Sequence, residues 1–205
     1  MISQAQVLLA RRQCGVLAEL VGQTPDGEVY CPTWFTTGSV AAERSGHRGA
    51  LGMCDALDML KAHMQGHSWG IRRAAIFTIN QVGKSHHGSV VFPAAVFGAL
   101  PAAKVVMTGF GDDFIRESAP YVKWFMERPE YALAYPDVRL GGIGTVDASD
   151  NAHRVDVLRR EPGSGDGGWE KAGGYLVCRS FGGAVNGLPM HCGIMTDLYK
   201  NWQQA

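Results

Sequence analysis

Apolar residues recur at intervals of three and four in two stretches of the first third of the chain, which is the spacing of a helix with one buried face. The first predicted helix covers 4–21 and ends before Gly22. Its apolar face is formed by Val7, Leu8, Cys14, Leu17 and Val21. The second predicted helix covers 49–64. Its recurring positions are Leu51, Cys54, Leu57, Leu60, Lys61 and Met64. Residues 23–46 are rich in Pro, Gly, Thr and Ser and are predicted to form a loop.

Later in the chain, short runs of β-forming residues alternate with helical patterns. The predicted strands are Arg73–Asn80, Lys104–Thr108, Tyr175–Phe181 and His191–Asp197. The predicted helical segments are 90–100, which Pro93 is expected to kink, and Asp112–Arg128, which Pro120 is expected to break near Ala119. Residues 141–173 are rich in Gly, Asp and Ser, and Gly163–Gly174 is predicted to be an exposed loop or hairpin connection. This alternation predicts an α/β fold with a buried parallel sheet.

One short motif carries chemistry. Gly83, Lys84 and Ser85 follow a predicted strand and precede a helical segment, which is the setting of a phosphate-binding loop. In such a loop, backbone N–H groups at the helix start meet the phosphates, the lysine reaches the terminal phosphates and the serine hydroxyl coordinates Mg²⁺. The glycine that usually opens the motif would fall at position 78, where this chain has Thr78.

A second signal is the strand that ends at Asp197. A hydrophobic strand ending in an acid is the form of a Walker B element, whose carboxylate holds the metal ion. The order strand, GKS, helix, strand, insertion, strand and acid is more informative than either signal alone. The sequence therefore predicts an ATP and Mg²⁺ site.

The residues that carry these signals also carry a family resemblance. The chain from about residue 44 to 205 resembles the ATPase domain of the large terminase of tailed phages, in four passages taken in the family's order. These passages are HRGALGMCDALDMLKAHMQG, IRRAAIFTINQVGKS, the segment from KVVMT to DVRL, and GGYLVCRSFGGAVNGLPMHCGIMTDLYKNWQQA. The resemblance implies a P-loop NTPase-like core over 47–205, incomplete relative to the full domain and without a nuclease domain, preceded by a helix and loop extension over 1–46. The family form also lacks the first glycine, which accounts for Thr78.

The resemblance also implies site residues and partners. Lys84 stabilises phosphate charge, Ser85 and Asp197 hold Mg²⁺, and Gln81 and Val82 form the loop wall beside Gly83. His86 follows and belongs to the expected nucleotide contacts. The implied activity is ATP hydrolysis that drives double-stranded DNA into a procapsid, with the portal or small terminase subunit as partners and a homo-oligomer as the working form.

Departures from the family pattern leave alternatives open. The family's two adjacent Walker B acids correspond to Thr196 and Asp197, so one carboxylate is missing and weak hydrolysis or nucleotide binding alone is expected. The glycine turn at Asn186–Pro189 lacks the family's arginine, and the chain ends at Ala205, where the family continues. One alternative is a terminase-like module for assembly or partner binding without ATPase activity. Another is an unrelated α/β small-molecule enzyme with a chance GKS.

Composition excludes few classes of function. Lys+Arg and Asp+Glu both number 19, so DNA binding would need local basic clusters. The candidates are Arg11–Arg12, Arg72–Arg73 and Arg159–Arg160. The five cysteines form no CxxC pair, which argues against a disulfide framework or a structural zinc site and favours a reducing, cytoplasmic setting. No apolar run approaches the length of a membrane span, and the N-terminus does not have the pattern of a signal peptide.

Several residues have a structural reading beside a functional one. His86 and His87 at a helix start are expected to be partly exposed caps unless they touch phosphate. Cys192 is expected to pack in the core rather than bind metal with His191, and Trp34 to be a core or loop residue rather than an adenine contact. Asp112 and Asp113 are expected to cap the following helix. Trp169 is either an interaction anchor or a loop plug.

Overall fold

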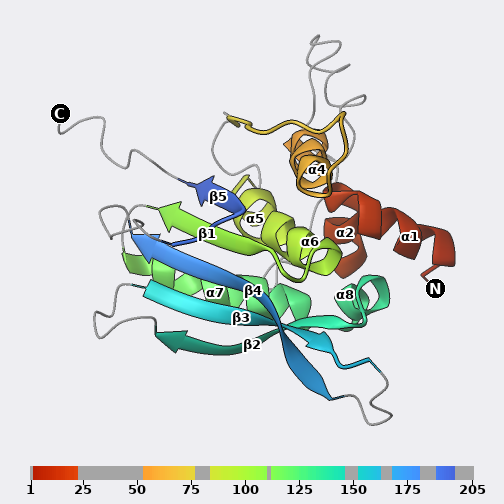
Figure 1. The fold of residues 1–205 in the computed structure, drawn as a ribbon. Coiled ribbons are helices and arrows are strands. Elements are labelled where there is room, and N and C mark those ends of the chain that lie inside the picture. The colour runs from red at the N-terminus through yellow and green to blue at the C-terminus, as the bar shows by residue number, and fades with distance from the viewer. Residues whose placement is uncertain are drawn as a thin grey trace.

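The fold is an α/β arrangement in which helices cover a mixed sheet (Figure 1). The computed structural model describes residues 2–22, 53–76, 84–109, 112–145, 152–162, 168–180 and 188–196. The helices are α1 (Gln4–Arg12), α2 (Cys14–Val21), α4 (Met53–Met64), α5 (Lys84–His86), the π-helical segment η2 (His87–Val91), α6 (Phe92–Ala99), α7 (Asp112–Met126) and α8 (Pro129–Ala134). The strands are β1 (Lys104–Gly109), β2 (Val138–Thr145), β3 (Ala152–Arg160), β4 (Trp169–Ser180) and β5 (Cys192–Met195).

The sheet is mixed rather than parallel. Its strand order is β2-β3-β4-β1-β5, with β1 parallel to both β4 and β5. Strand β3 runs antiparallel to both of its neighbours, β2 and β4. The predicted α/β class is therefore confirmed, but the prediction of a parallel sheet is wrong for its β2–β3 half.

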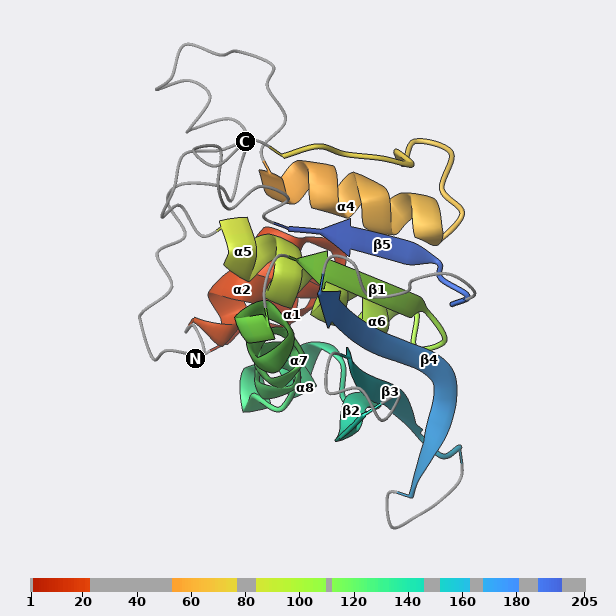
Figure 2. The same ribbon diagram turned by 90° about the vertical axis from the view of Figure 1, so that its left-hand side faces the viewer.

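One face of the sheet forms the main core. Side chains that alternate along the strands, such as Val105, Met107, Val155 and Val157, are fully buried in it. Helices α6 and α7 supply the opposite wall through Phe92, Val96, Phe97, Ala119, Val122 and Phe125. In Figure 2 these helices and α8 lie on one side of the strands. Burying this many apolar side chains is the main favourable term in folding of the domain.

Two helical predictions are corrected by the structure. The helix predicted over 4–21 is two helices, because Gln13 between them has an extended backbone with φ −121° and ψ 121°. Leu8, predicted to face the core, is 53% exposed, whereas Cys14, Leu17 and Val21 are buried as predicted. The predicted break near Ala119 is also wrong, because α7 continues through Pro120. Ala119 and Val122 are fully buried on either side, and this packing outweighs the cost of a proline inside a helix.

The second predicted helix is confirmed from Met53, where the description resumes, to Met64. The described half of the strand predicted over Arg73–Asn80 is not a strand: residues 73–76 have no regular structure, and Ala74 and Ala75 are exposed. Exposed backbone of this kind lacks the two buried faces that a central parallel strand requires. Residues 77–80 lie outside the described residues.

Residues 141–173, for which no strand was predicted, contain most of the antiparallel half of the sheet. Residues 169–174, the end of the predicted loop or hairpin connection Gly163–Gly174, belong to strand β4. Strand β3 alternates buried Val155 and Val157 with outward residues, which is a period of two. Strand β4 begins at Trp169, earlier than predicted, and has a bulge where its register with β3 shifts. Gly173 has φ +85° in this bulge, a conformation that glycine adopts without strain.

None of the described helices is both long enough and apolar enough to cross a membrane.

Candidate functional site

The predicted phosphate-binding motif leads into a buried helix. Segments α5, η2 and α6 follow one another without interruption over 84–99. The described part of this helix begins at Lys84, which follows Gly83 in the sequence. Ser85 in the first turn is exposed. Gln81, Val82 and Gly83 lie outside the described residues, and for Lys84 only the backbone is described.

A widened turn lets this helix accept Pro93. The five residues of η2 form a π-helical segment, and the Phe92 N–H donates to the His87 carbonyl five residues back. A proline lacks the N–H that would continue the α-helical pattern, and a π-bulge shifts the pairing locally. Pro93 and its neighbours Phe92 and Ala94 are buried in the core, so the helix that follows the motif is firmly anchored.

Three parallel strands end at one edge of the sheet, which we call the carboxyl edge. Gly109 of β1 lies opposite Ser180 of β4, and the Thr196 N–H donates to the Thr108 carbonyl at 2.9 Å. In Figures 1 and 2, α5 lies on the side toward which the arrowheads of β1, β4 and β5 point. Ligands of α/β proteins bind at the carboxyl ends of parallel strands, so this is the favourable edge for a phosphate site.

The predicted fourth strand is confirmed as β5, which pairs in parallel with β1. Its last residue is Met195, so Thr196 and Asp197 follow it at the carboxyl edge. The Thr196 Oγ1 is buried and has no hydrogen-bond partner among the described residues. Asp197 itself lies outside the described residues, as do the Asn186–Gly187 part of the glycine turn and Trp34.

Of the two histidines after the motif, predicted to be partly exposed caps, His86 is half-buried and His87 is fully buried. His87 is 2% exposed, and the His86 ring meets Phe125 of α7 edge-on at 6.1 Å between ring centres. Burial, and to a lesser extent the neighbouring His87, lowers the pKa of His86 to about 4. His86 is therefore neutral at pH 7 and can offer a phosphate a hydrogen bond but no positive charge.

His191 and Cys192, considered above as possible metal ligands, have structural roles. His191 accepts a hydrogen bond at Nδ1 from the Lys104 N–H at 3.1 Å. Cys192 packs against the core, and burial raises the pKa of its thiol to about 11. The described residues contain no group of three His, Cys, Asp or Glu side chains that could hold a metal ion.

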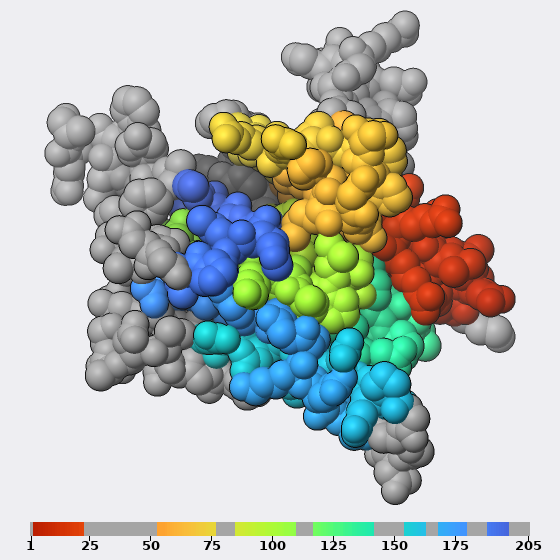
Figure 3. Space-filling model, in the orientation of Figure 1, coloured from red at the N-terminus to blue at the C-terminus, as the bar shows by residue number. Residues whose placement is uncertain are grey.

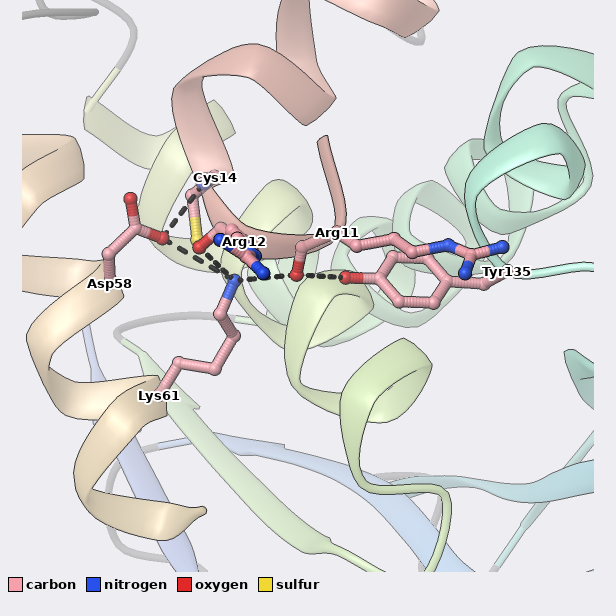
Figure 4. A network of polar contacts seen from close by, with 6 residues as sticks. All are labelled: Arg11, Arg12, Cys14, Asp58, Lys61 and Tyr135. Carbon is pink, nitrogen blue, oxygen red and sulfur yellow. Dashed lines mark hydrogen bonds and ion pairs between the residues drawn. The ribbon is translucent and has the colours of Figure 1, made fainter. Parts of the chain in front are cut away.

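Sequence reasoning missed a buried polar network at the opposite end of the helices, which we call the helix clamp (Figure 4). Lys61 of α4, 2% exposed, donates to the Arg12 carbonyl at 2.8 Å and the Arg11 carbonyl at 3.4 Å, at the end of α1. It also pairs with Asp58 at 3.5 Å, and Asp58 accepts from the Cys14 N–H at 2.8 Å. The clamp thus supplies hydrogen-bond partners to the carbonyl groups at the end of α1 and to the first N–H group of α2.

The clamp also reaches the segment just before strand β2, where the antiparallel half of the sheet begins. The Tyr135 hydroxyl donates to the Arg11 carbonyl at 2.8 Å, and the Arg11 Nε donates to the Ala134 carbonyl at 2.6 Å. Burial raises the pKa of Asp58, although Lys61 counteracts this, and burial raises the pKa of the Cys14 thiol well above its ordinary value. A thiol of that kind is not a nucleophile at neutral pH, so the clamp is structural. The one sequence signal was a lysine, Lys61, on the apolar face of a predicted helix.

Comparison with protein-family models, with curated proteins and with solved structures gives no match for this chain. Over its described residues the molecule is a mixed α/β protein with a five-stranded sheet flanked by helices.

Proposed function

We propose that the chain is a nucleotide-binding domain of the P-loop type, which binds ATP with Mg²⁺ where helix 84–99 begins. The observation that carries the proposal is the position of that helix: its first described residue, Lys84, follows Gly83 in the sequence, and its first described turn lies on the side of the carboxyl edge. A helix start of this kind combines unpaired backbone N–H groups with the positive end of the helix dipole, and both attract phosphate.

The residues of the motif fit a nucleotide phosphate and its metal ion. In the proposal, Gly83 and the wall residues Gln81 and Val82 surround the phosphates, and Lys84 neutralises their charge. Ser85, exposed at the first turn, and Asp197, two residues beyond β5, hold Mg²⁺. The buried, unpartnered Thr196 hydroxyl beside Asp197 fits a site with further oxygen ligands, such as metal-bound water. Bound Mg²⁺ would supply charge stabilisation for a phosphoryl group.

The wider function we propose is that of a DNA-packaging terminase ATPase domain, in line with the sequence resemblance. Its partners would be double-stranded DNA, a portal or small terminase subunit and further copies of this chain. The antiparallel β2–β3 pair adds to the parallel β4-β1-β5 half and lies away from the proposed site.

A second candidate is a terminase-like module that binds nucleotide or a partner without hydrolysis. Thr196 favours it, because a threonine hydroxyl cannot take a proton from water as a carboxylate does. The two candidates share one fold and one binding site and differ only in turnover.

Titration of the protein with ATP and Mg²⁺, together with measurement of phosphate release, tests the proposal. The unsubstituted protein should bind saturably, and Lys84→Ala should weaken binding by about tenfold or more because a charge-assisted contact is lost. Lys123→Ala, which removes a lysine on α7, is the matched control and should bind normally. Binding with phosphate release supports the ATPase, and binding without release supports the module. Absence of ATP binding by the unsubstituted protein would contradict the ATPase and the nucleotide-binding form of the module.

A further inference from the structure

The sheet has a second face that no described helix covers, which we call the outer face. Side chains on a strand alternate between faces, so Val106, Tyr175 and Val177 point away from the main core and form a small apolar group with Leu188. Figure 3 views the molecule from this side, and no described helix lies over strands β3 and β4 in it. On this face Arg139, Arg154, Arg160 and Lys171 are exposed to solvent, whereas Tyr175, Val177 and Arg179 are buried.

Basic residues are concentrated on the outer face. They come from four strands: Lys104, Arg139, Arg154, Arg160, Lys171 and Arg179. The strand register places Arg139, Leu158 and Lys171 side by side, Arg160 beside Trp169, and Arg154 beside Val177. Among the described residues, the acids that accompany them are Asp156 on the face and Asp137 at its rim. Because Arg179 is buried, five basic and two acidic side chains remain at the surface, an excess of three positive charges on a chain whose net charge is zero.

Aromatic rings hold the guanidinium groups in place. The Arg139 Cζ lies 4.1 Å from the centre of the Trp169 ring, and the Arg154 Cζ lies 4.4 Å from the centre of the Tyr175 ring. Stacking of this kind fixes the plane of a guanidinium while its edge remains available to donate hydrogen bonds. The Trp169 ring, at the start of β4, also lies near a second arginine: the Arg160 Cζ is 5.8 Å from its centre.

We propose that the outer face binds the phosphate backbone of duplex nucleic acid without reading its sequence. A duplex carries about one negative charge per 1.7 Å, and clustered arginines and lysines bind it by displacing counterions. A single strand is the poorer fit, because proteins that bind single strands stack bases on free aromatic rings, and here arginines cover the rings. The inference deepens the proposed function, which names double-stranded DNA as a partner, by assigning that partner a surface. Its test is independent of nucleotide binding, because the outer face and the start of helix 84–99 lie on different parts of the molecule.

Fluorescence anisotropy with a labelled duplex of about 20 base pairs, in the absence of nucleotide, tests the inference. If three phosphates are neutralised, affinity should fall by about 40-fold between roughly 50 and 200 mM salt. Arg154→Gln should weaken binding about fivefold to tenfold and make the salt slope shallower by about 0.9. Asp156→Asn should tighten binding, because its carboxylate now accepts from Arg154 at 3.2 Å and from Lys171 at 2.6 Å.

Arg159→Gln is the matched control. Arg159 lies on the same strand but on the opposite side, and it pairs with Glu170 at 2.6 Å. Its substitution should leave duplex affinity unchanged, as should Lys84→Ala, which separates this inference from the proposed nucleotide site. The inference is overturned if the duplex does not bind at low salt, or if Arg159→Gln weakens binding as much as Arg154→Gln. It is also overturned if polyglutamate competes as well as duplex does, since the face would then be a site for acidic protein.

Discussion

The junction of α1 and α2 and the start of helix 84–99 are both helix ends, yet the chain treats them differently. At the junction, side chains of the clamp supply the partners: Lys61 for the carbonyls that end α1, and Asp58 for the first N–H of α2. At Lys84 the first turn lies on the side of the carboxyl edge, with Ser85 exposed to solvent. A helix end whose polar groups are already paired stabilises the fold, whereas a helix end open to solvent can bind a solute.

Removing the buried lysine should break the first half of this comparison and have the largest effect. Lys61→Met leaves the buried Asp58 carboxylate and the last α1 carbonyls without their cation. We expect a loss of about 3 kcal/mol in the free energy of unfolding, measured by urea denaturation, because an uncompensated buried charge costs more than a lost contact.

The control for this substitution is Lys123→Met. Lys123 pairs with Glu127 one turn away on α7, where both side chains are partly exposed. Its loss should cost no more than about 0.5 kcal/mol. The double variant Lys61→Met with Asp58→Asn should be less destabilised than the two single variants added together. Equal effects of Lys61→Met and Lys123→Met would show that the clamp is not a stabilising unit.

The second prediction concerns how the stability of the protein depends on pH through His86, in the first turns of helix 84–99. The pKa of His86 is about 4 in the folded protein against 6.5 ordinarily, because burial disfavours its charged form. The unfolded chain therefore binds a proton more readily than the folded protein, and stability is lost as pH falls from 6.5 toward 4. Allowing for partial solvent screening, His86 should account for about 1–2 kcal/mol of this loss.

Unfolding measured by urea at several pH values checks this prediction. His86→Gln should make the stability profile flatter between pH 6.5 and 4, whereas His67→Gln, at an exposed histidine stacked on Trp69, should leave it unchanged. An identical pH profile for His86→Gln and the unsubstituted protein would show that His86 is solvated and not packed beneath Phe125.

Local patterns predicted elements whose own residues fix their structure. The buried strands at Val105 and Leu176 and the helix over Met53–Met64 could be read from runs and spacing alone. Long-range packing decided the rest: the break at Gln13 depends on Lys61 and Asp58, which are more than forty residues away. Continuity through Pro120 likewise depends on the burial of Ala119 against other elements.

The functional surfaces also include one part that local sequence predicts and one part that depends on long-range pairing. A motif such as Gly83–Ser85 predicts that a helix follows, because turn and helix are local, and the helix is found from Lys84. The basic outer face was not predicted, because its six residues are spread over 76 positions of sequence, from Lys104 to Arg179, and only strand pairing brings them to one surface. Arg159 and Arg160, predicted as one basic cluster, lie on opposite sides of β3 because neighbouring strand residues alternate.

Amide hydrogen exchange of the protein with and without ATP and Mg²⁺ tests the central claim most directly, because it compares the two helix ends in one experiment. If nucleotide phosphates bind where helix 84–99 begins, exchange should slow at the amides of Ser85, His86 and His87 and remain unchanged at the clamp amide of Cys14. Saturating nucleotide that leaves the first turn at Lys84 unprotected, or that protects the clamp equally, would contradict the account.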